Sequence, residues 1–137
     1  KDETKIKMSG ALTILLGKSE DNVYYYEGEL DPVSYSNFKT ASFKEIRDII
    51  IRKKRDVISR YVTNTECEEQ AKKDKKVDPK KECEDMDFFV VVKPDAEATY
   101  RRIVDILDEM TINVVGRYAL VDITEDEDKL VKLTEKR

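Results

Sequence analysis

Apolar positions change their spacing twice in the second half of this chain. Residues 88–92, Phe-Phe-Val-Val-Val, form a continuous apolar run typical of a strand that lies inside a sheet. Pro94 ends this strand, because proline has no N–H to give to a sheet ladder. After Thr99, which can cap a helix, apolar side chains recur at helical spacing as far as Met110, and residues 113–123 are apolar and β-branched again. The pattern predicts a strand, a helix and a second strand.

Two short strands are expected near the start of the chain. Ala11–Leu16 and residues 23–27 are apolar runs, and the turn-forming stretch Gly-Lys-Ser-Glu-Asp-Asn between them predicts a hairpin. Three tyrosines follow one another in the second run. Because side chains alternate across a strand, Tyr25 is expected on the face opposite to Tyr24 and Tyr26.

A long helix is expected over residues 42–61, where one apolar stripe recurs at helical spacing. Ser42 and Glu45 have the spacing of a capping box, in which each side chain accepts a hydrogen bond from the other residue's backbone N–H. Residues 28–39, with Pro, Ser and Asp, are expected to be a linker. The basic residues 52–55 spread around this helix, so we expect them to form a solvated face and not one nucleic-acid patch.

These elements predict an α+β fold in which two helices pack on one face of a mixed sheet of four to five strands, in the order ββαβαβ. The other face would stay open, and an open face or edge favours self-association or strand addition by a partner. Residues 11–124 are expected to form this domain. Residues 1–10 would be a flexible lead-in, with Ile6 and Met8 as the candidate start of an edge strand. Residues 125–137 would be a charged tail that forms a short helix, an added strand or neither.

Residues 62–86 are expected to be a polar insertion that contains both cysteines, Cys67 and Cys83. Two thiols that bound such a loop predict a disulfide in an oxidising compartment. On the chain-entropy model that cross-link would stabilise the fold by roughly 3 kcal/mol. Two free thiols or a metal site are the alternatives. The chain has no His, and two Cys alone do not complete a tetrahedral zinc shell, so we expect no metal.

Composition narrows the classes of function. Charged residues make up 41% of the 137 residues, above the roughly 25% typical of globular domains. The net charge of −4 argues against nucleic acid as the main partner, since phosphate binding needs a basic surplus. No run of 18 apolar residues and no signal peptide are present in the sequence. The chain begins at Lys1 and not at Met, which we interpret as a trimmed or processed chain.

Catalysis is not expected from this sequence. The commonest general base near neutral pH is absent because there is no His, and the four glycines are too scattered to form a phosphate-binding loop. The acidic residues 125–128 lack the spacing and the Gly of a calcium-binding loop. We therefore expect no enzyme activity, no cofactor and no metal.

Residues 88–124 resemble the periplasmic domain of the ExbD/TolR family, and the preceding hairpin and helix resemble it loosely. The family pattern is an apolar strand ending in a basic residue, then a small residue, Asp, a few polar residues and Tyr, followed by an amphipathic helix and a Gly-containing apolar strand. The matching positions here are Lys93, Asp95, Tyr100, residues 106–108, and for the last strand either residues 115–116 or residues 118–121. Pro94 departs from the pattern, because it replaces the family's small residue, and so does the cysteine-containing insertion.

The resemblance implies a dimer-forming periplasmic domain that couples the proton-motive force to a TonB-like energiser of outer-membrane transport. It implies one transmembrane helix upstream of this sequence, an ExbB-like membrane pentamer bound through that helix, and a place in the periplasm of a Gram-negative bacterium. The family's proton-carrying Asp would lie in that helix. Two alternatives remain: a TolR-like domain that engages peptidoglycan, and a small-ligand-binding α+β domain.

Five residues are candidates for partner binding: Asp95, Tyr100, Arg117, Tyr118 and Leu120. The local alternative is that Asp95 only turns the chain after its strand and that Tyr100 packs at the first turn of the helix. Tyrosine suits an interface because it combines apolar area with a hydroxyl group.

Overall fold

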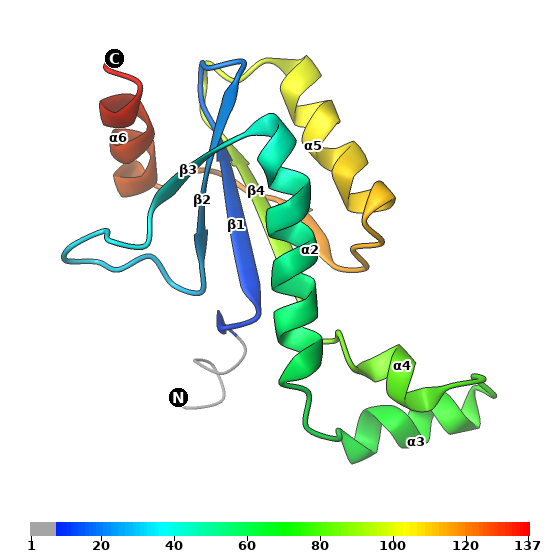
Figure 1. Cartoon of the computed structure of the whole chain (residues 1–137). Helices are drawn as coiled ribbons and strands as arrows, with labels where there is room; N and C mark the ends of the chain where they lie inside the picture. Colours follow the sequence, from blue (N-terminus) through cyan, green and yellow to red (C-terminus); the bar gives the residue numbers. More distant parts are fainter. Residues whose placement is uncertain (1–7) are drawn as a thin grey trace.

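The computed structural model describes residues 8–137, so the expected strand start at Ile6 lies outside the described residues. Within these residues the chain forms five helices and one mixed sheet of five strands, in the spatial order β3-β2-β1-β4-β5 (Figure 1). The predicted α+β class is confirmed. The predicted order ββαβαβ is wrong in detail, because one further strand and three further helices are present.

The sheet combines a hairpin with a parallel half. Strand β1 (Ala11–Leu16) pairs antiparallel with β2 (Asn22–Glu27), as the hairpin pattern predicted. On its other side β1 pairs in parallel with β4 (Phe89–Pro94), which in turn pairs in parallel with β5 (Tyr118–Leu120). Strand β3 (Lys39–Ser42) adds antiparallel to β2, so β2 is not an edge strand of the sheet.

The two predicted helices are present. Helix α2 (Phe43–Ser59) begins after Ser42, whose hydroxyl accepts from Glu45 N–H while the Glu45 carboxylate accepts from Ser42 N–H. Helix α5 (Tyr100–Ile112) begins after its cap Thr99. Each cap satisfies backbone N–H groups that the first turn of a helix leaves without a partner.

The main core lies between one face of the sheet and helices α2 and α5. Tyr25 belongs to this core, whereas Tyr24 and Tyr26 point to the other face, so the predicted alternation is confirmed. The core is built by alternate residues of β1, β2 and β4 against apolar positions of the two helices: Leu12, Ile14, Leu16, Val23, Val90, Val92, Ile46, Ile49, Ile50, Ile106 and Met110.

The other face of the sheet is not left open. Residues 125–137 include helix α6 (Glu125–Thr134), which buries Val131 against Leu15, Tyr24 and Tyr26. Thr124 and Glu127 form a second capping box at its start. The expectation of helices on one face alone is therefore wrong.

Residues 62–86 form a separate helical lobe, which we call the cysteine lobe. It holds α3 (Thr65–Lys73) and α4 (Pro79–Cys83) and projects beyond the end of α2, away from the sheet (Figure 1). The sulfur atoms of Cys67 and Cys83 lie 2.04 Å apart and join the two helices in a disulfide.

The last strand is much shorter than the predicted residues 113–123. Residues 113–115 close α5: Val115 N–H donates to Met110 C=O (2.8 Å), and Val114 adopts a positive φ of 52°. This bonding pattern is that of a Schellman turn. Strand β5 then covers Tyr118–Leu120 only, which lies within the second of the two ranges considered for the last strand.

Candidate interaction surface

Strand β5 leaves one side of its backbone without a strand partner within residues 8–137. Val90 N–H donates to Arg117 C=O (3.0 Å), so the backbone groups of Arg117 face β4. Because successive residues of a strand direct their backbone groups to opposite sides, those of Tyr118 and Leu120 face away from β4. This edge is a template for one more strand.

Apolar side chains gather beside this edge. Five of the ten large apolar side chains that are exposed among residues 8–137 lie between the end of α5 and the residue after β5, with exposed fractions from 43% to 71%. We call them the β5 surface: Ile112, Val114, Tyr118, Leu120 and Val121. Residues 118–121 also contain none of the Lys or Pro residues that commonly protect sheet edges. Exposed apolar side chains beside a free strand edge make this surface a candidate interaction site.

The opposite edge of the sheet is less suited to a partner. Strand β3 carries the exposed polar residues Lys39 and Thr40 and runs directly into α2. A lysine on an edge strand opposes pairing with another chain, because its charge would have to be desolvated. The β5 edge is therefore the better candidate of the two.

Hydrogen bonds from Lys54 of α2 and from Arg117 hold the backbone that carries the β5 surface. Lys54 Nζ donates to Val114 C=O at 2.8 Å, across 60 residues of sequence. Arg117 Nη1 donates to Asp85 C=O at 3.4 Å, which ties the start of β5 to the end of the cysteine lobe. These contacts fix the loop between α5 and β5 although its apolar side chains point into solvent.

Asp95 lies at the far end of β4 from Arg117, with its side chain buried. Its carboxylate accepts from Arg137 Nη2 at 2.5 Å and from Glu97 N–H at 2.8 Å, while its own N–H donates to Leu16 C=O. Asp95 thus shapes the turn between β4 and α5 and also holds the end of the chain beside that turn.

A second buried ion pair lies between the sheet and α6. Glu127 accepts from Lys93 Nζ (3.0 Å) and from the Tyr26 hydroxyl (2.5 Å). Burial raises the pKa of Glu127, but the hydrogen bonds from Tyr26, Thr124 and Lys93 outweigh it and lower that pKa below its usual value. Burial, together with the hydrogen bond to Glu127, raises the pKa of Tyr26 to about 12. Both groups therefore keep their charge states throughout the neutral range.

Glu135 repeats this arrangement at the end of α6. Its carboxylate accepts from the Tyr24 hydroxyl (2.8 Å) and from Lys18 and Ser19 N–H, and it also pairs with Arg137. Burial alone would raise the pKa of Glu135, but these hydrogen bonds together have a larger effect in the opposite direction. The pKa of Glu135 therefore lies below its usual value. Helix α6 is thus attached to the sheet mainly by charged hydrogen bonds.

The five sequence candidates do not form one site. Arg117, Tyr118 and Leu120 follow one another at the β5 edge, and Tyr100 is 82% exposed at the first turn of α5. Asp95 is buried under Arg137. Partner binding through any of them stays a prediction.

The sequence pattern does not predict that Ile112, Val114 and Val121 are exposed beside β5. The predicted strand over residues 113–123 places Val114 and Val121 inside a sheet, and Ile112 lies between the predicted helix and that strand. Val114 and Val121 are exposed because β5 covers only Tyr118–Leu120, and Ile112 is exposed at the end of α5.

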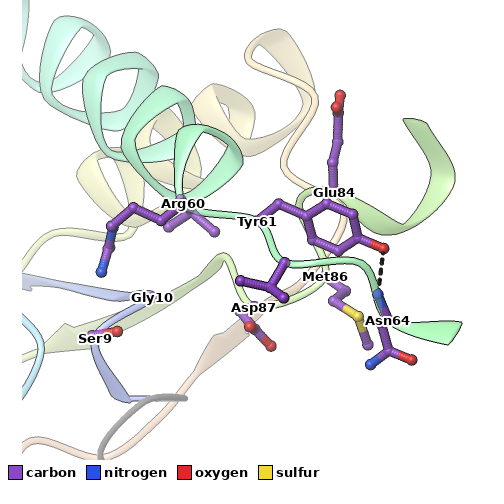
Figure 2. A pocket seen from close by; sticks show the side chains of 10 residues that line it. Ser9, Gly10, Arg60, Tyr61, Asn64, Glu84, Met86 and Asp87 are labelled. Carbon is purple, nitrogen blue, oxygen red and sulfur yellow. Dashed lines mark hydrogen bonds between the residues drawn. The ribbon is translucent and has the colours of Figure 1, made fainter. Parts of the chain in front are cut away.

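A small pocket lies where α2 meets the cysteine lobe (Figure 2). Its volume is about 160 Å³, below the roughly 300 Å³ at which ligand pockets begin. Tyr61, which lines it, already donates to Glu68 (2.5 Å) and accepts from Asn64 N–H (3.0 Å). A wider hollow of about 340 Å³ beside α6 is lined by Glu135 and Arg137, which are paired with each other. Neither pocket supports the small-ligand alternative.

Among residues 8–137 no group of three or more His, Cys, Asp or Glu side chains is placed to hold a metal ion. No helix in the same part of the chain is both long and apolar enough to span a bilayer.

The β5 surface therefore stands out as an exposed apolar strand edge, held in place from α2 and from the end of the cysteine lobe. Comparison of the chain with protein-family models, with curated proteins and with solved structures found no match.

Proposed function

We propose that this chain is the periplasmic adaptor domain of an ExbD-like stator protein, which docks an extended segment of a TonB-like energiser along strand β5. The observation that carries the proposal is the unpaired, apolar and uncharged edge at residues 118–121. The domain acts mechanically in this proposal and transforms no molecule. The motif Lys93, Asp95 and Tyr100 and the strand–helix–strand order around it support the family assignment.

Strand addition fits the geometry of this edge. The outward N–H and C=O groups of Tyr118 and Leu120 would bind the main chain of the incoming segment. Tyr118 and Leu120 pair with Val90 and Val92, so their side chains point to the α5 face of the sheet. Main-chain bonds would give affinity, and contacts with these side chains would select the sequence of the segment.

The cellular setting belongs to the same proposal. The Cys67–Cys83 disulfide supports an oxidising compartment such as the periplasm. An upstream transmembrane helix would carry the proton-responsive Asp and bind an ExbB-like pentamer. A second copy of the chain could pair with the same edge, so dimer formation and energiser binding would compete for it.

A binding experiment with an edge variant tests the proposal. We expect a peptide from the energiser to broaden NMR signals of β5 and to bind Leu120→Lys at least tenfold more weakly, because the lysine places a desolvated charge on the edge. Thr40→Lys on the opposite edge is the matched control and should bind normally. Equal binding by both variants, or binding of isolated sacculi instead of the peptide, would overturn the energiser proposal; the second result would favour the TolR-like role.

The longer protein gives an independent test. When the upstream helix is expressed together with this domain, we expect co-purification with a pentameric ExbB-like membrane protein. A chain that inserts in the membrane but purifies alone would contradict the stator assignment.

A further inference from the structure

The tip of the cysteine lobe carries a dense positive charge. Residues 72–81 contain six lysines against two aspartates, and they contain no arginine and no aromatic residue. The six are Lys72, Lys73, Lys75, Lys76, Lys80 and Lys81. The chain as a whole has a net charge of −4, so this surplus is local.

The positive charges of the tip are not neutralised by the protein. All six lysines are exposed, and none of them takes part in an ion pair within residues 8–137. The nearby Asp78 carboxylate instead caps α4, where it accepts from Lys81 N–H (3.2 Å). The tip thus exposes six ammonium groups that have no ion-pair partner within residues 8–137.

The tip has a defined shape. The Cys67–Cys83 disulfide joins α3 to α4, and the turn after α3 is closed by Lys76 N–H donating to Ala71 C=O (3.0 Å). Val77 lies at the apex, fully exposed and flanked by Lys76. An apolar side chain among lysines suits the boundary between water and lipid.

The lobe also lies at the end of the molecule where β1 begins (Figure 1). Gly10 packs closely on Asp87, the residue after the lobe, so that a Cβ atom on residue 10 would lie 2.0 Å from the Asp87 carbonyl oxygen. Phe89 N–H donates to Gly10 C=O (3.3 Å). If a membrane helix precedes this chain, as the proposed function holds, the polypeptide enters the domain at the base of the lobe.

We propose that the tip at residues 72–81 binds the anionic phospholipid surface of the membrane in which the upstream helix is anchored; this inference rests on the proposed function. Lysines act as compact point charges, which suits a diffuse layer of lipid phosphates. The absence of arginine and of aromatic residues from the tip disfavours a nucleic acid, whose recognition uses bidentate and stacking contacts. Lipid contact would orient the domain relative to the bilayer.

The negative charge of the whole chain does not oppose this contact. Salt screens charges beyond about 8 Å at physiological ionic strength. Closer acidic residues are present in the lobe, because Glu68 and Glu69 lie about one helical turn from Lys72 and Lys73, and Glu82 follows Lys81. None of these three carboxylates forms an ion pair with a lysine of the tip within residues 8–137. A membrane anchor would further raise the effective concentration of the tip at the lipid surface.

Vesicle sedimentation with the chain alone tests the proposal. We expect binding to vesicles of phosphatidylglycerol and phosphatidylcholine, a steep fall between low and high salt, and no binding to pure phosphatidylcholine. The triple variant Lys72→Gln, Lys76→Gln and Lys81→Gln should bind about 100-fold more weakly, since each lysine near the surface contributes about fivefold. The control Lys18→Gln, Lys39→Gln and Lys44→Gln removes the same charge from exposed sites outside the lobe and should bind normally.

No binding to the anionic vesicles, an equal loss in both triple variants, or tighter binding to duplex DNA than to the vesicles would overturn the lipid proposal. The result of the vesicle experiment can be distinguished from the result of the peptide-binding test of the adaptor function. Failure of vesicle binding with peptide binding intact would remove the lipid contact alone. Failure of peptide binding with vesicle binding intact would remove the adaptor role alone.

Discussion

Val114 combines a β-branched side chain with a backbone φ of 52°, two features that are seldom found together. Its position just after α5 is one that glycine usually occupies in a Schellman turn. The valine is nevertheless exposed and adds apolar area beside β5. Backbone strain of this kind is often found where a protein binds a partner, and here it coincides with the β5 surface.

Replacing Val114 should separate the effect of backbone strain on stability from the effect of the valine side chain on peptide binding. We expect Val114→Gly to raise the free energy of unfolding by about 1 kcal/mol, because glycine adopts positive φ without a steric cost, and to weaken binding of the energiser peptide. Urea denaturation and peptide titration measure the two effects. Lys75→Gly, at a similar φ of 58° after α3, should stabilise less and leave peptide binding unchanged. A loss of stability in Val114→Gly would show that the valine packs usefully despite its backbone.

The sequence predicts those helices and strands whose apolar residues recur at a regular spacing along the chain. Helices α2 and α5 have apolar stripes and caps, and β1, β2 and β4 have apolar runs. Strand β3 was missed because its four residues, Lys-Thr-Ala-Ser, show no apolar alternation and are recruited by pairing with β2. The capping box of α6 at Thr124 and Glu127 is a local signal for the start of a helix within the predicted charged tail.

Helices α3 and α4 could not be predicted from apolar spacing. They bury only Ala71 and Cys83, so they depend on their caps Asn64 and Asp78 and on the cross-link between them. The β5 surface could be predicted only in part. Tyr118 and Leu120 were among the predicted candidates. Which further residues are exposed depends on where the Schellman turn ends and β5 begins. That boundary depends in turn on tertiary contacts, such as the hydrogen bond from Lys54 to Val114.

The dependence of the cysteine lobe on its cross-link can be measured. In the double variant Cys67→Ser, Cys83→Ser we expect amide hydrogens of α3 and α4 to exchange much faster, because about 3 kcal/mol of stabilisation is lost from a segment with little core. Exchange in β1 and β4 should stay slow. Faster exchange throughout the sheet would contradict the view of the lobe as a locally stabilised unit.

At the scale of the whole molecule, the two faces of the sheet are held by different forces. Helices α2 and α5 bury aliphatic side chains, whereas α6 is attached largely through the carboxylates of Glu127 and Glu135. Charged contacts are more sensitive to pH than apolar ones. The face covered by α6 is therefore expected to open first when the solution is acidified.

Glu127→Gln tests this expectation. Removing one partner of a buried ion pair leaves Lys93 uncompensated, so we expect a loss of about 3 kcal/mol in the free energy of unfolding at neutral pH. The folded pKa of Glu127 is lowered, so its contribution is present above the ordinary Glu pKa of about 4.3 and is lost as pH falls through the folded value. The difference between wild type and variant should shrink below about pH 4.3. Urea denaturation at several pH values gives the measurement.

Glu125→Gln is the matched control, because Glu125 lies on the same helix in an exposed pair with Lys129. It should change stability very little at any pH. A loss equal to that of Glu127→Gln would mean that α6 responds to its overall charge and not to the buried contact.

The parallel direction of β1, β4 and β5 has a consequence for the proposed adaptor function. A pull that enters where β1 begins and leaves through a segment paired to β5 would act along the strands. The hydrogen bonds along the six residue pairs between β1 and β4 would then be loaded in shear, so that all of them resist the pull at the same time. They would not break one after another, as they would if the strands were pulled apart from one end. In the function proposed above, such a sheet would transmit tension between a membrane motor and its target without first coming apart.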